Sequence, residues 1–257
     1  CGREFAAFVL SGVLVKLLLG DLGIDVCMHV VSFGGDVLKK DVSWEQIRSL
    51  AERDEVVLNC ADPEAEQQMK EEVDKVLRTG DSVGGIFEVV GHGVPPGLGT
   101  YAQWDERLDG LLAGAVMSLQ AVKAVEIGAG VTAASSPGSA VHDEIGYGAA
   151  TGFTRTRNNA GGIEGGVSNG EDIVVRGYLK PISTLRRPLQ SVDFATREPV
   201  KAAYERSDVC VVPAAGVAAE AMVALTLARC ALEKFGGDSM TETTRNLKGY
   251  LEQVKNY

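Results

Sequence analysis

Residues 155–184 read RTRNNAGGIEGGVSNGEDIVVRGYLKPIST, and this stretch predicts both a local fold and a ligand site. Five glycines fall within ten residues, at positions 161, 162, 165, 166 and 170. Because glycine has no Cβ, backbone N–H groups there can approach a flat or anionic ligand closely. A strand-like run at 173–179 follows, and the lysine and hydroxyl residues of 180–184 offer charge-assisted donors for a phosphate. Glycine content alone favours a flexible surface loop, but the polar residues around the glycines reverse that preference and favour a binding site.

The bulk composition restricts the class of protein. The chain has 257 residues, of which 45% are hydrophobic, enough for a sizeable core in one large domain or two small ones. A net charge of −10 argues against a general nucleic-acid or anionic-membrane binder. Residues 1–100 carry 9 Lys and Arg against 17 Asp and Glu, whereas residues 151–206 carry 9 against 6. A locally basic stretch in an acidic chain suits a small anionic ligand in a defined pocket.

Cysteine and histidine usage indicates a reducing compartment and no metal centre. The five cysteines form no CxxC pair and there are only three histidines, so we expect neither a zinc site nor a disulfide framework, and a cytoplasmic location. No hydrophobic run reaches membrane-spanning length by this reading, and no signal peptide is present. The chain begins with Cys1 inside a helical pattern, and we therefore expect a fragment whose N-terminal portion is missing.

Periodicity predicts a mixed α/β or α+β chain. Helices are expected at 5–18, 43–53, 63–79, 102–119, 214–235 and 240–256, and strands at 24–33, 83–90, 121–127 and 172–179. Ser43 with Gln46 resembles a capping box, and Asp62-Pro63 is a strong helix start. A kink or bulge is expected at Gly84-Gly85. The interval 128–170 has little periodicity, and so long an irregular stretch is usually functional; a polar linker is expected from 180 to about 207.

A nucleotide fingerprint is the main competing motif. Residues 125–133 spell GxGxxA after a predicted strand, which would suit a nicotinamide-dependent oxidoreductase using Gly128 and Gly130. Such a site needs a long helix to begin there, but the following Ser-Ser-Pro-Gly at 135–138 would stop one at once. The acid expected about twenty residues further on is also not convincingly placed. This reading is the least favoured.

The remaining candidate nucleophiles and bases are weak. His29 and His92 lie in strand-like segments and are expected to be structural, while His142 in the irregular region is the one histidine worth following. Cys210 lies between two valines and is expected to be a small buried hydrophobe. Arg206-Ser207-Asp208 alone could be a surface ion pair or a helix-entry turn.

Together, these segments resemble the chorismate synthase family. RNNAGGIEGGVSNGEDI (157–173) is similar to that family's glycine-rich signature. GDSVGGIFEVVGHGVPPGLG (80–99), AVMSLQAVKAVEIGAG (115–130) and KPISTL (180–185) fit in the right order. The opening CGREFAAFVLSGVLVKLLL resembles the helix after the family's Arg-x-Ser flavin motif, with Cys1 in the Ser position. The resemblance covers the whole chain and implies that the family's N-terminal part is absent.

The resemblance implies a reaction and a fold. Members convert 5-enolpyruvylshikimate 3-phosphate to chorismate and phosphate by a 1,4-anti elimination, the last common step of the shikimate pathway. These carbon–oxygen lyases need reduced FMN although the reaction has no net redox change, and the flavin is reduced either by NADPH or by an external supply. The implied fold is an α/β (α+β-like) sandwich with central helices packed between antiparallel sheets. Residues 1–257 would be the C-terminal part of one domain, assembled as a cytoplasmic homotetramer with no nucleic-acid or membrane partner.

The resemblance also implies site residues. The positions matching the family's FMN contacts are Gln120, Ala121, Gly165, Lys180, Pro181, Ile182, Ser183, Thr184 and Arg206. Glycine backbone can pack on the isoalloxazine ring, and Lys180 can offset the flavin's negative charge. We expect the ligand to lie between Gly165, residues 180–184 and Arg206. Asp208 matches the acidic residue beside the flavin and is expected to be catalytic, assisting proton transfer through N5. No metal ligand is implied.

The chain departs from the family in one motif. Where members commonly read Arg-His-Asp-Pro-Cys, residues 206–210 read Arg-Ser-Asp-Val-Cys, so no role is expected for Ser207. The family's two catalytic histidines, its Arg-rich substrate-phosphate site and the Arg of Arg-x-Ser belong to the absent segment. A non-catalytic remnant that serves only in flavin binding or assembly is therefore the alternative to an enzyme.

Overall fold

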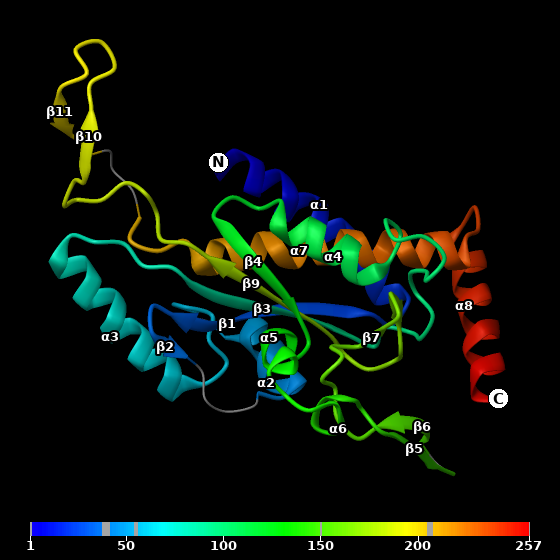
Figure 1. Ribbon diagram of the computed structural model, residues 1–257. Coiled ribbons are helices and arrows are strands. Elements are labelled where there is room, and N and C mark those ends of the chain that lie inside the picture. Colours follow the sequence, from blue (N-terminus) through cyan, green and yellow to red (C-terminus); the bar gives the residue numbers. More distant parts are fainter. Residues whose placement is uncertain (1, 38–41, 54–55, 150, 205–207, 257) are drawn as a thin grey trace.

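The computed structural model describes residues 2–37, 42–53, 56–149, 151–204 and 208–256. Figure 1 shows the chain as a twisted sheet with helices on both faces. The helices are α1 Gly2–Asp21, α2 Trp44–Arg48, the 3₁₀ turn η1 Ser49–Glu52, α3 Pro63–Thr79, α4 Leu108–Met117, α5 Gly130–Ala134, α6 Gly138–Val141, α7 Val212–Phe235 and α8 Met240–Lys255. The strands are β1 Asp25–Phe33, β2 Asp36–Val37, β3 Gly85–His92, β4 Val122–Ile127, β5 Ile145–Gly148, β6 Gly152–Arg155, β7 Ile163–Glu164, β8 Val167–Ser168, β9 Ile173–Leu179, β10 Gln190–Val192 and β11 Pro199–Lys201.

One five-stranded sheet organises the described residues. Its strand order is β2-β1-β3-β9-β4, and every neighbouring pair is antiparallel. The other strands form two-stranded hairpins, β5-β6, β7-β8 and β10-β11. The α+β-like class expected from the sequence is confirmed, because helices cover an antiparallel sheet.

Helices cover the two faces of the sheet unequally. α7 packs against β1 and β3, α4 packs beside α7 against β4 and β9, and α1 lies on α7. α2, α3 and α5 lie on the opposite side (Figure 1). The outer surface of α1 keeps large apolar side chains in the open, at Leu10, Val13, Leu14 and Leu17.

Small residues let α7 approach both of its neighbours closely. A Cβ on Gly216 would lie 1.8 Å from Cε of Met28 in β1, so the end of the Met28 side chain fills the space that a larger residue at 216 would need. On the other side, a Cβ on Gly12 of α1 would lie 2.4 Å from Cβ of Ala221. The buried face of α7 is largely alanine. With such small residues, the helix backbones pack densely against each other without large side chains between them.

Several expected local features are confirmed and two are wrong. Ser43 and Gln46 form the capping box, and α3 begins after an Asp62 cap and ends at Gly80 in the left-handed region. The expected bulge at Gly84-Gly85 is wrong, because the register shift lies on β1 between Val30 and Ser32. The linker expected from 180 to 207 is wrong in part, because it contains the β10-β11 hairpin.

α7 also corrects the expectation that no segment could reach across a membrane. By length and composition alone this helix is long and apolar enough to do so. However, 61% of its most apolar window is buried inside the protein, against the sheet and its neighbouring helices. Its apolar composition is thus accounted for by its position in the core.

A row of charged residues crosses the sheet on the face away from α7. His29, Glu88, Arg176 and Glu126 occupy paired positions on β1, β3, β9 and β4. Nε2 of His29 lies 2.9 Å from Oε1 of Glu88, and Nε of Arg176 lies 2.6 Å from Oε2 of the same carboxylate. Tyr178 donates a hydrogen bond to Glu126. Because Glu88 is almost fully buried, this row satisfies a charge that would otherwise be costly.

Adding a single methyl group to α1 tests how closely α1 packs on α7. Gly12→Ala should lower the free energy of unfolding by about 1–3 kcal/mol, because its Cβ would overlap Ala221. Gly20→Ala in the same helix is the matched control, since no atom lies within 4 Å of its Cβ position. That control should stabilise by up to about 1 kcal/mol through helix propensity. Urea unfolding of both variants decides the matter, and equal effects at the two positions would contradict the packing described.

Protonation of Glu88 should couple stability to pH. Burial alone would raise the pKa of Glu88, but the hydrogen bond with His29 and the charge of Arg176 hold that pKa below its ordinary value. The stabilisation is therefore present above the unfolded-state pKa and is lost as pH falls through the lower folded-state pKa. Glu88→Gln should cost about 3 kcal/mol at pH 7 and should flatten the decline in stability below pH 5. Urea titrations from pH 7 to pH 3 measure this, with the exposed Glu252→Gln as control; an unchanged acid slope in Glu88→Gln would refute the coupling.

Candidate functional site

Most of the expected flavin contacts gather where β9 ends and β4 begins. We call Gln120, Ala121, Asp208 and residues 180–184 the strand-end cluster. The backbone N–H of Lys180 donates to the carbonyl oxygen of Ala121 at 3.0 Å, which joins two stretches sixty residues apart. Ala121 has a φ of +70°, a conformation that non-glycine residues rarely adopt. Such outliers persist where the surrounding structure fixes them, and they concentrate at ligand sites.

The start of β3 holds the rest of the strand-end cluster in place. Oγ of Ser82 donates to the carbonyl oxygen of Ile182 at 2.6 Å, and the N–H of Val83 donates to the carbonyl oxygen of Val209 at 3.1 Å. A Cβ on Gly84 would lie 2.3 Å from the carbonyl oxygen of Leu179. The sequence placed Ser82, Val83 and Gly84 in the stretch 80–99 that carried the resemblance, but it gave them no supporting role at the site.

The strand-end cluster presents polar groups to solvent. Lys180, Ser183 and Asp208 are all exposed, and no ion pair to Lys180 occurs within the part of the chain that the structure describes. Gln120 is also exposed and donates to the carboxylate of Glu4 on α1. An ammonium group beside a hydroxyl is suited to an anionic ligand such as a phosphate. Arg206 lies outside the described residues, so its expected place in the cluster stays a prediction.

Gly165 does not join the strand-end cluster within one copy of the chain. It lies in the turn between β7 and β8, close to the end of β9 that begins with Ile173. Lys180 follows the other end of β9, and seven residues of strand span on the order of 20 Å. The expectation that one ligand lies between Gly165 and residues 180–184 stays a prediction; within one copy, β9 separates the two positions.

Backbone packing explains most of the glycines around position 165. Gly161 packs on Gly128 so closely that a Cβ would lie 2.4 Å from the Gly128 nitrogen, and Gly162 is similarly close to the carbonyl oxygen of Asp172. Both are buried and have positive φ angles. Gly165 differs because it is exposed and nothing lies within 4 Å of its Cβ position. Of these three glycines, Gly165 alone has a Cα open to another molecule.

The nucleotide fingerprint at 125–133 does not form a dinucleotide site. Gly128 packs on the backbone of residues 159–161, and a Cβ on Gly130 would collide with the Glu126 side chain. The helix that starts there, α5, has only five residues. β4 also runs antiparallel to β9, whereas a dinucleotide fold needs parallel neighbours. The glycines are thus accounted for by packing.

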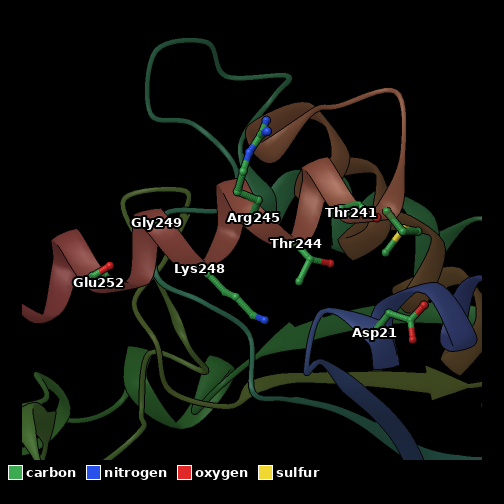
Figure 2. Close-up of a pocket in the computed structure, with 8 residues that line it drawn as sticks. Asp21, Thr241, Thr244, Arg245, Lys248, Gly249 and Glu252 are labelled. Atoms are coloured by element: carbon green, nitrogen blue, oxygen red, sulfur yellow. The ribbon is translucent and has the colours of Figure 1, made fainter.

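Hollows elsewhere in the structure lie away from the strand-end cluster. Figure 2 shows one of about 740 Å³, where Thr244 and Lys248 of α8 project toward the end of α1 at Asp21. Another of about 380 Å³ is bordered by His142 together with Asp109, Asp143 and Glu164. The acidic lining of the second hollow does not favour an anion. Within the described residues no group of three or more His, Cys, Asp or Glu side chains gathers as a metal site would.

Comparison with known proteins identifies the family. The sequence profile described as "Chorismate synthase" matches residues 1–232. The chain belongs to the chorismate synthase family. Chorismate synthases of Koribacter versatilis and Acidobacterium capsulatum are 68% and 66% identical to it over 261 residues, which is 99% of this chain and 66% of each relative. The chain thus spans just under two thirds of the length of these relatives.

A solved chorismate synthase confirms the fold. The crystal structure superposes with a TM-score of 0.84 at 40% identity, covering 99% of this chain and 70% of the other. The arrangement of sheet and helices described above is therefore that of the chorismate synthase family. Each segment that carried the resemblance in the sequence lies within the matched residues.

Cys210 follows the strand-end cluster and is a packing residue. Burial raises the pKa of its thiol to about 11, against weaker opposing hydrogen bonds from the N–H groups of Val212 and Val211. A thiol of this kind stays protonated at neutral pH and is a poor nucleophile. This agrees with its interpretation from the sequence as a small hydrophobe.

Proposed function

We propose that this chain is the C-terminal part of a chorismate synthase domain, and that the complete protein converts 5-enolpyruvylshikimate 3-phosphate to chorismate and phosphate. The observation that carries this proposal is the identity of 60–68% to three curated chorismate synthases across 99% of the chain. The reaction is a 1,4-anti elimination that releases phosphate and one proton, so the enzyme is a carbon–oxygen lyase. It requires reduced FMN, with NADPH or an external supply as the reductant.

The strand-end cluster supports a flavin site by its chemistry. Lys180 supplies an exposed positive charge and Ser183 an exposed hydroxyl, while Ala121 presents a fixed, strained backbone beside them. Residues 180–184, with Gln120 and Ala121, would hold the FMN and its phosphate, and Arg206 would add a second cation. Bound reduced FMN supplies electron density to the substrate, and the protein contributes position and charge.

Asp208 is proposed as the catalytic residue of this part of the chain. The Val83–Val209 hydrogen bond anchors it next to the start of β3, where Ser82 also contacts residue 182. Its exposed carboxylate can accept a proton at Oδ beside the cofactor and release it to solvent, a role that suits general acid–base catalysis. The residues that bind the substrate phosphate would come from the part of the family domain outside this chain.

Assembly is part of the same proposal. We infer a cytoplasmic homotetramer without nucleic-acid or membrane partners, as in the family. A neighbouring copy would then be needed for Gly165 to contact the same flavin, because β9 separates Gly165 from Lys180 in one copy. The apolar outer face of α1 would pack against the second sheet of the family sandwich, since the relatives are longer than this chain.

Flavin binding tests the role of Lys180. FMN should bind to the complete protein, and Lys180→Ala should weaken binding by about 10- to 100-fold, the usual range for losing one charge-assisted hydrogen bond. Lys248→Ala, an exposed lysine on α8, is the matched control and should bind FMN normally. Fluorescence titration of FMN measures both. Identical titrations for the two variants would remove Lys180 from the site.

Turnover tests both the reaction and Asp208. The complete protein should form chorismate from 5-enolpyruvylshikimate 3-phosphate only with reduced FMN, and comparing assays with and without NADPH identifies the reductant. Asp208→Asn should lower kcat by about 100-fold or more while FMN still binds. The exposed Asp238→Asn is the control. No chorismate from the wild-type protein would reject the proposed function, whereas near-normal kcat in Asp208→Asn would reject only the role of Asp208.

A further inference from the structure

The β10-β11 hairpin projects from the body of the protein as an arm. We define the arm as residues 189–202; Figure 1 shows it extending beyond the sheet and helices. Residues 189–201 are exposed throughout, and Phe194 at the tip is 102% exposed relative to a free residue. The tip is nevertheless ordered, because Oδ1 of Asp193 accepts from the N–H groups of Ala195 and Thr196 at 2.9 and 2.8 Å. A two-stranded hairpin this isolated gains little stability by itself.

The opposite end of the protein carries an apolar hollow of about 540 Å³. The hairpin β5-β6 forms one wall, where Tyr147 and Phe153 stand on paired strands with ring centroids 5.1 Å apart. The end of α8 forms the other wall through Leu251 and Val254, and Lys255 borders it. All four apolar side chains are exposed to solvent. Aromatic walls of this kind are typical of the energetically dominant part of a protein interface.

We propose that the arm of one copy docks its Phe194 into this hollow on a second copy of the chain. In Figure 1 the arm lies at the opposite end of the molecule from the β5-β6 hairpin and the end of α8, which line the hollow, so the two surfaces cannot meet within one copy. Two copies placed side by side in antiparallel orientation bring each arm to the other's hollow, which is the reciprocal contact of a two-fold dimer. Asp193 next to Phe194 is complementary in charge to Lys255 at the hollow.

A reciprocal contact would use both surfaces of each copy. The arm contributes 14 residues and the hollow eight from each copy. Together they reach the roughly 20–30 residues per partner of a standard interface. The inference rests on the self-assembly in the proposed function, names the surfaces that form it, and does not depend on the reaction.

Cross-linking in the full-length protein tests the contact directly. A photoreactive benzoylphenylalanine at position 194, in a mixture of unlabelled and ¹⁵N-labelled copies, should join position 194 of one copy to residues 145–155 or 248–256 of the other. Mass spectrometry of the cross-linked peptides distinguishes the isotopes. Cross-links confined to one isotope, cross-links to other regions, or none at all would overturn the proposal.

Sedimentation equilibrium gives an independent measurement. Phe194→Ser and Phe153→Ser should each weaken self-association at least tenfold, because central aromatic contacts dominate interfaces. Tyr101→Ser is the matched control, since Tyr101 is 85% exposed on a separate loop, and it should leave association unchanged. If the wild-type protein assembles but both variants assemble equally well, only the arm contact is rejected. If the wild-type protein is monomeric throughout, the proposed homo-oligomer fails as well.

Discussion

Helix α7 lies so close to α1 that a Cβ on Gly12 would overlap Ala221, and on its other side the Met28 side chain of β1 fills the space beside Gly216. The helix buries its small residues against β1 and β3 and provides the platform on which α1 rests. It also fixes the end of the chain segment that carries Asp208, because that segment runs directly into its first turn. The packing of α7 therefore determines both the core and the place of Asp208 at the site.

The opposite face of the sheet is organised by charge. Basic and acidic side chains alternate across four neighbouring strands, in the order His29, Glu88, Arg176 and Glu126, and each contacts a partner of opposite type. Within the described residues, Nδ1 of His29 has no hydrogen-bond partner, whereas Nε2 faces the carboxylate of Glu88. A row of this kind penalises any slip in strand register, because a shift of one residue would turn every member to the other face.

Sequence patterns predicted what is local and missed what depends on register and distance. The long helices and central strands followed from periodicity and from caps such as Asp62 and Gly80. The arm was missed because residues 190–201 alternate weakly and contain a proline within β11. The charged row was missed because its members are single residues on four different strands. Gly165 and Lys180 are only fifteen residues apart in sequence, but a strand that crosses the sheet lies between them, and the sequence alone could not show that separation.

The strand-end cluster draws on three separate parts of the chain, and Glu4 on α1 and Ser82 before β3 form hydrogen bonds to it. Because these parts are far apart in sequence, the cluster forms only when the sheet, α1 and α7 have assembled. A ligand that binds there must therefore select the completed fold over every partly folded state. By mass action, such a ligand at a hundred times its dissociation constant would add about 2.7 kcal/mol to the stability of the folded protein. In cells, the supply of that ligand would then regulate how much of the protein survives as well as how fast it works.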